Sequence, residues 1–96
     1  MPFKSLSYSF SEESIAAHAP AGPGVYGIHN SQKWIYVGEA GDIRAGLLRH
    51  LRGDDSCIAL MGPHGFAFEE CPAGLNGGRT QALILELQPV CNRGAG

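Results

Sequence analysis

Two short segments rich in β-branched and aromatic residues, separated by a turn, set the strongest constraint on how this chain can fold. Residues 24–29 read Gly-Val-Tyr-Gly-Ile-His, and residues 33–38 read Lys-Trp-Ile-Tyr-Val-Gly. Such compositions are typical of β-strands. The three residues between them, Asn-Ser-Gln at 30–32, favour a turn, and so short a connection makes an antiparallel hairpin the simplest pairing. An antiparallel sheet is therefore expected.

A helix is predicted after the hairpin, over residues 42–52. Its apolar residues fall on one stripe at helical spacing: Ile43, Leu47, Leu48 and Leu51. Asp42 is a suitable N-cap, and Gly53 stands where a helix would end. Gly46 in the middle is unusual, because glycine inside a helix costs roughly 1 kcal/mol relative to alanine.

Later segments complete the predicted fold. Residues 66–71 favour a third strand, and residues 79–88, apolar almost all round, predict a buried helix that ends at Pro89. The order of these elements predicts a single α+β domain over residues 24–93, in which helices flank a three-stranded antiparallel sheet. Residues 1–23 are expected to form a lead-in segment with a short helix.

Charge and cysteine content narrow the class of protein. Seven Lys and Arg stand against nine Asp and Glu, so a nucleic-acid surface would need its basic residues gathered in one place. Residues 44–52 hold three of the seven. Cys57, Cys71 and Cys91 are widely spaced and are expected to be reduced. We expect a cytoplasmic protein, since neither a secretory signal nor a membrane-spanning run is evident.

The two ends of the hairpin carry a family resemblance. Gly24-Val25-Tyr26, then nine residues, then Tyr36-Val37-Gly38 resembles the signature of the GIY-YIG nuclease superfamily. The beginning and end of the following helix, and the Leu-Ile, Pro and Asn pattern within residues 83–92, are also similar to that family. The resemblance implies a phosphodiesterase that acts on nucleic acid, DNA above all, with Mg²⁺ or Mn²⁺ as its cofactor.

The resemblance also implies roles for individual residues. Tyr26 and Tyr36 match tyrosines that take part in proton transfer, and Asn92 matches an asparagine that helps to position the site. Gly38 would let the backbone turn close to the substrate. The remaining candidates are basic residues of the predicted helix, with Arg49 and His50 as catalytic groups and Arg44 and Arg52 as phosphate contacts.

Two positions depart from the family pattern. The arginine expected ten residues after the second tyrosine is Gly46 here. With Pro89 fixing the register, the metal-binding glutamate is replaced by Thr80, whose neutral hydroxyl is a poor sole ligand for Mg²⁺. A second register would make Glu86 the metal ligand, but it needs residues to be missing before Pro89. The two losses together predict a weak or inactive enzyme.

Three functions stay open at this point. The first is a metal-dependent DNA endonuclease, and the second is a non-catalytic relative that binds nucleic acid through residues 44–52. The third is a protein-interaction or regulatory module, with a protein partner or a second copy of the chain. No membrane partner is expected.

Overall fold

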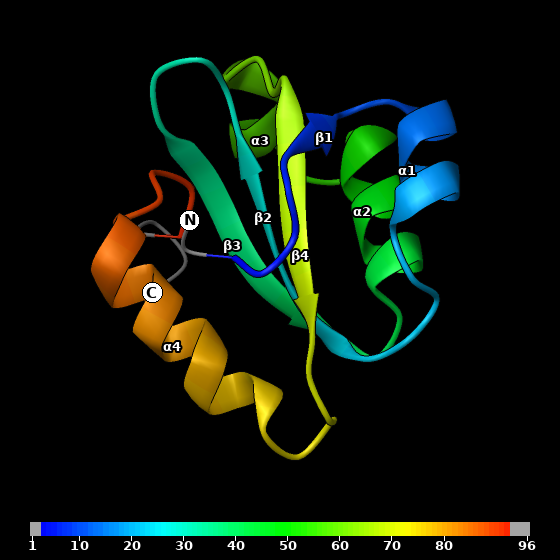
Figure 1. Cartoon of the computed structure of the whole chain (residues 1–96). Helices are drawn as coiled ribbons and strands as arrows, with labels where there is room; N and C mark the ends of the chain where they lie inside the picture. The colour runs from blue at the N-terminus through cyan, green and yellow to red at the C-terminus, as the bar shows by residue number, and fades with distance from the viewer. Residues whose placement is uncertain (1–2, 93–96) are drawn as a thin grey trace.

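A four-stranded antiparallel sheet organises the protein, which a computed structural model describes over residues 3–92. The sheet has the strand order β1-β4-β2-β3. The elements follow the chain as β1 (Tyr8–Ser9), α1 (Glu12–His18), β2 (Gly24–His29), β3 (Trp34–Ala40), α2 (Ile43–Leu51), α3 (Ser56–Leu60), β4 (Gly65–Glu70) and α4 (Asn76–Leu87). Figure 1 shows α1 and α2 on one face of the sheet and α4 on the other.

The predicted hairpin is the centre of this sheet. Tyr26 in β2 lies opposite Gly38 in β3, and a bulge follows the pairing of Ile28 with Tyr36. The turn is held by the Asn30 side chain, whose Oδ1 accepts hydrogen bonds from the backbone N–H groups of the two residues that precede β3. The local turn chemistry therefore fixes the register that brings the two tyrosines to the same region.

Side chains on the two faces of the sheet form two separate clusters. Tyr26 and Tyr36 belong to the cluster under α1, α2 and α3, together with buried residues such as Ile28 and Phe66. Val25 and Val37 point the other way and pack with Leu83 of α4. Because successive strand residues alternate between faces, the tyrosines lie across the sheet from α4.

The sheet has one strand more than the sequence predicted. Residues of the lead-in form β1, which pairs with β4 through Tyr8 opposite Phe66. A strand of two residues is too short to show an alternating pattern, so only its tertiary pairing reveals it. The same segment fills both clusters, since Phe3 is buried on the α4 face and Ile15 on the other.

The two main helices match the sequence to different degrees. For α2, the structure confirms Asp42 as the N-cap, with Oδ1 3.0 Å from the backbone nitrogen of Ala45, and Gly53 follows with φ +88°. For α4, the expectation of an all-round buried helix is wrong. Leu83 is buried, but Leu85 is 73% exposed, because α4 covers the sheet with one side only. No helix within residues 3–92 is long and apolar enough to cross a membrane.

The expectation of reduced cysteines is wrong for two of the three. Cys57 at the start of α3 and Cys91 after α4 form a disulfide, whereas Cys71 is free. The segment that carries Cys91 lies along the outer edge of β3, where the Cys91 N–H donates to the Ile35 carbonyl. Thirty-four positions separate the paired cysteines, and spacing rules detect only closer patterns.

Candidate nucleic-acid site

The two tyrosines of the hairpin bring their hydroxyl groups together over a glycine. The ring centroids of Tyr26 and Tyr36 lie 6.2 Å apart. A Cβ atom at Gly38 would lie 3.1 Å from each hydroxyl and 2.6 Å from the ring of Tyr36. Any side chain at position 38 would therefore push the Tyr36 ring away. Glycine at this position allows the rings of Tyr26 and Tyr36 to lie this close together.

Helix α2 brings an imidazole to the same place. The Tyr26 hydroxyl lies 2.7 Å from His50 Nε2, and His50 Nδ1 lies 3.1 Å from an Asp54 carboxylate oxygen. A carboxylate only accepts, so Nδ1 carries the proton and, while the ring is neutral, Nε2 accepts from the phenol. The His50 ring also packs against Tyr36, with centroids 5.0 Å apart. The result is a hydrogen-bonded chain from phenol to imidazole to carboxylate.

Burial sets the protonation of the two phenols. It is the largest cause that raises the pKa of Tyr26, and the neighbouring Tyr36 raises it further. Burial also raises the pKa of Tyr36, followed by the nearby carboxylates of Asp55 and Asp54. The charge of Arg49 acts in the opposite sense on both tyrosines. Both hydroxyls are therefore protonated at neutral pH, and Arg49 is the cation whose field reaches them.

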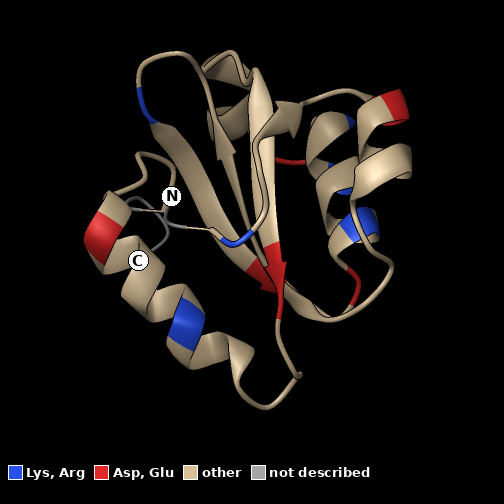
Figure 2. Ribbon diagram, in the orientation of Figure 1, with Lys and Arg blue, Asp and Glu red and all other residues tan. Residues whose placement is uncertain are grey.

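The predicted basic residues divide between two sides of α2. Arg49 is exposed and its charge acts on the tyrosines. Arg44 instead donates from Nε to the carbonyl oxygen of Ala19, 2.9 Å away, which ties α2 to the end of α1. Arg52 is the exposed C-cap of α2. Figure 2 shows how these basic positions are distributed along the helix. The structure thus brings Tyr26, Tyr36 and His50 into contact, with the charge of Arg49 acting on both tyrosines and Arg44 bonded to Ala19 instead.

Gly46 adjoins this site. A Cβ atom there would lie 3.3 Å from a ring carbon of Tyr26 and 3.5 Å from its hydroxyl. The positive-φ glycines of the described chain are Gly53 and Gly62, so the backbone at Gly46 does not require glycine. Position 46, where the family resemblance expects an arginine, is therefore next to Tyr26. Because this residue is glycine, no side chain extends from α2 toward Tyr26 at this point.

The residues present do not fit the divalent cation that the family resemblance implies. Thr80 is buried, and its hydroxyl donates to the Asn76 carbonyl 2.8 Å away within α4. Glu86 is exposed on α4, across the sheet from the tyrosines (Figure 1). Within residues 3–92, no three side chains of the metal-ligating types are grouped to hold an ion.

Asn92 has a positioning role. Its Oδ1 accepts from the Val37 N–H at 2.8 Å, and its Nδ2 donates to the Val37 carbonyl at 2.9 Å. Val37 lies between Tyr36 and Gly38, so this amide holds the strand that carries the second tyrosine. With both of its groups engaged by the backbone, Asn92 is not placed as a substrate ligand in this conformation.

Sequence reasoning missed two charged groups near these elements. One is Asp54, which is exposed beyond the end of α2 and still contacts His50, because a carboxylate four residues after a histidine at a helix end can reach that histidine. The other is Glu69, which is 5% exposed and held by Arg79 through contacts of 2.8 and 3.1 Å. No local pattern indicates this second pair, because β4 and α4 are brought together only by the tertiary fold.

Comparison with known proteins identifies the fold. No protein-family model and no curated protein matches the chain. Among solved structures, the magnesium-bound N-terminal GIY-YIG endonuclease domain of UvrC from Thermotoga maritima matches with a TM-score of 0.66 and 22% identity, covering 78% of this chain and 91% of that domain. Two point mutants of the same domain, at 21% and 22% identity, have the same TM-score and coverage of this chain. At this identity, the likeness establishes the fold.

Proposed function

We propose that this chain, which has the GIY-YIG fold, binds nucleic acid at the surface formed by Tyr26, Tyr36, Arg49 and His50 and hydrolyses phosphodiesters only weakly. The observation that supports this most directly is the 2.7 Å contact between the Tyr26 hydroxyl and His50 Nε2. It joins a histidine ring nitrogen to a phenol, and an exposed arginine precedes that histidine in α2. These are the groups needed to hold a phosphate and to move a proton near it.

Each residue of this surface has a definite part in the proposal. The Arg49 guanidinium can hold two oxygens of one phosphate. The Tyr36 hydroxyl, raised in pKa and therefore protonated, donates a hydrogen bond to a phosphate oxygen. The water oxygen bonds to phosphorus while the P–O bond to the leaving oxygen breaks. Tyr26 takes a proton from this water as it gives its own to Nε2 of His50, and the leaving oxygen takes a proton from solvent. Asp54 stabilises the imidazolium that forms, because its carboxylate already contacts Nδ1.

The same geometry explains why hydrolysis would be slow. Burial raises the pKa of Tyr26, so its phenolate is costly to form. The Cβ atom of an arginine at position 46 would lie 3.5 Å from the Tyr26 hydroxyl. The positive charge of such an arginine would lower the pKa of Tyr26, whereas Gly46 supplies no charge. Thr80 stands where the family resemblance expects the metal-binding glutamate. It is buried, hydrogen-bonded within α4, and carries no charge.

Nicking of supercoiled plasmid in Mg²⁺ or Mn²⁺ tests the proposal. The natural chain should nick slowly, Tyr36→Phe should lose this activity, and Gly46→Arg should increase it. Phe removes only the hydroxyl, so it is the matched control for packing. Fast nicking by the natural chain, or nicking that survives Tyr36→Phe, would contradict the assigned roles. Absence of any DNA binding would instead favour a protein-interaction module on this fold.

A further inference from the structure

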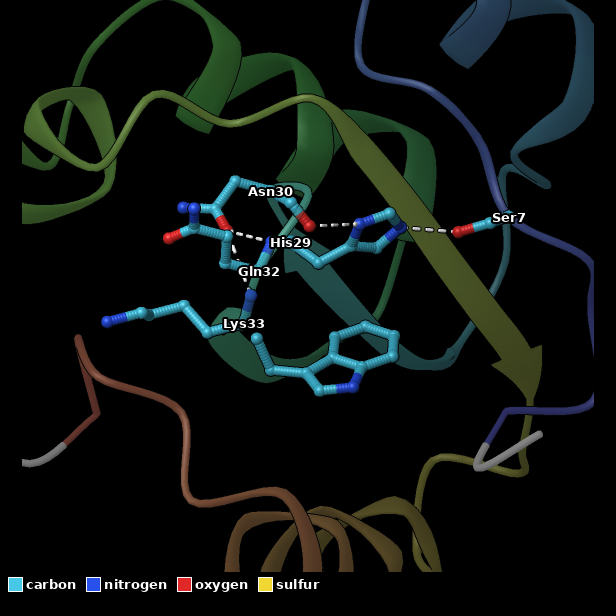
Figure 3. A pocket seen from close by; sticks show the side chains of 6 residues that line it. Ser7, His29, Asn30, Gln32 and Lys33 are labelled. Atoms are coloured by element: carbon cyan, nitrogen blue, oxygen red, sulfur yellow. Dashed lines mark hydrogen bonds between the residues drawn. The ribbon is translucent and has the colours of Figure 1, made fainter.

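A polar groove lies at the turn end of the β2–β3 hairpin, and Tyr26 is not among the residues that line it. It consists of two adjoining hollows of about 290 and 250 Å³ that share Ser7, His29 and Asn30. Figure 3 shows the first hollow, with the side chains of Gln32 and Lys33 on its wall. We call this surface the hairpin groove. Neither Tyr26 nor Tyr36 lines it, so it is separate from the tyrosine site.

The groove is built rather than incidental. His29 is fixed on both ring nitrogens, by a hydrogen bond with Ser7 Oγ at Nε2 and by the Asn30 carbonyl 3.2 Å from Nδ1. A Cβ atom at Gly65 would come within 2.7 Å of the His29 ring, so the glycine leaves room for the imidazole. The Asn30 side chain is itself held by the Met61 carbonyl. The wall is therefore preorganised, which lowers the entropy cost of binding.

Lys33 is the one charged side chain among the residues that line the two hollows, beside two histidines. Neither hollow is lined by an aspartate or a glutamate, although the chain has nine of them. Lys33 and His29 line the first hollow, and His64 lines the second. No ion pair engages Lys33 in the described part of the chain. The groove therefore favours an anionic ligand.

The groove also offers part of one aromatic ring. The Trp34 ring meets His29 edge to face, with centroids 5.0 Å apart, packs against Phe3 with centroids 5.3 Å apart, and is half-buried. A planar ring can stack on such a surface, as bases do on aromatic side chains in nucleic-acid complexes. At about 290 Å³, the first hollow lies at the lower limit of the volumes of small-molecule sites.

We propose that the hairpin groove binds one nucleotide unit, with its base against Trp34 and its phosphate beside Lys33. If the nucleotide belongs to a nucleic-acid strand, this inference rests on the proposed function. The strand would then contact both the hairpin groove and the tyrosine site. A free mononucleotide has the same chemistry and is the other source of such a unit.

Nitrogen–proton NMR titration tests the groove directly. Trp34 is the only tryptophan, so the spectrum contains a single indole N–H resonance, and it belongs to this groove. AMP, a short single-stranded oligothymidylate and inorganic phosphate are the three probes. We expect a saturable shift with AMP or the oligonucleotide. Lys33→Gln should weaken binding about three- to fivefold, as for one exposed charge contact. Lys4→Gln makes the same charge change at an exposed position outside the groove and should have no effect.

Each outcome decides between the possibilities. A response to AMP alone assigns the groove to free nucleotides, and a response to the oligonucleotide alone assigns it to a strand. An equal response to inorganic phosphate, equal effects of the two lysine variants, or no response would overturn the proposal. Duplex binding that shifts the Gly38 amide while the Trp34 resonance stays still would reject the groove and keep the proposed function. A Trp34 shift with AMP in a chain that binds no duplex would do the reverse.

Discussion

Replacing Gly46 with alanine should make the domain more stable, and the size of the gain measures how well a side chain fits beside Tyr26. The backbone at Gly46 has no positive φ, so alanine recovers about 1 kcal/mol of helix propensity inside α2. Against this, the new Cβ would lie 3.3 Å from the Tyr26 ring, which must yield by a few tenths of an ångström. We expect a net gain of about 0.5 kcal/mol, or about 2–4 °C in Tm.

Gly78→Ala provides the matched control. Gly78 also lies in a helix, α4, but its added Cβ would meet no heavy atom within 4 Å. It therefore reports helix propensity alone, and the difference between the two variants gives the cost of the Tyr26 contact. Urea denaturation with the disulfide intact measures both. A loss of more than about 1 kcal/mol for Gly46→Ala, beside a gain for Gly78→Ala, would refute the reasoning. It would mean that the packing requires glycine and that position 46 has no room for an arginine.

Three further predictions concern stability and protonation. Stability should fall as the pH rises above about 10, because burial raises the pKa of Tyr26 and Tyr36 while the unfolded phenols ionise near 10, so that rising pH favours the unfolded chain. Ionisation of these two tyrosines, followed by phenolate absorbance, before the circular dichroism is lost would contradict this. Reduction of the Cys57–Cys91 disulfide should lower the free energy of unfolding by about 2–4 kcal/mol, since it opens a link across 34 positions; an unchanged urea midpoint would count against this linkage. Asn92→Ala should cost about 2 kcal/mol through two lost hydrogen bonds to β3 and should shift the Tyr36 amide resonance, whereas a variant as stable as the natural chain would show that these bonds contribute little.

Much of the fold could be predicted because its signals are local. Asn30 caps its own turn, and Asp42 caps its own helix, so both boundaries follow from neighbouring residues. The spacing of Tyr26 and Tyr36 on such a hairpin predicts that the two residues lie on adjacent strands, and the structure places them together. His50 follows Gly46 by four residues and is therefore close to it in helical angle, and the structure has both residues beside Tyr26.

The rest depends on contacts between distant parts of the chain. The pairing of β1 with β4 and the Cys57–Cys91 disulfide join segments whose local sequence carries no mark of the partner. The same holds for Arg79, which neutralises the buried Glu69. The composition of α4 does not show which side of the helix is buried. Leu85 is as apolar as Leu83, yet Leu85 is exposed and Leu83 is buried.

The salt dependence of duplex DNA binding tests the central claim most directly. Fluorescence anisotropy of a labelled duplex, titrated at several salt concentrations, gives the slope of log affinity against log salt. We predict salt-dependent binding, a slope reduced in magnitude by about one in Arg49→Gln, and no change in Lys4→Gln. Binding that ignores salt, or equal effects of the two substitutions, would contradict a nucleic-acid surface centred on Tyr26, Tyr36 and His50.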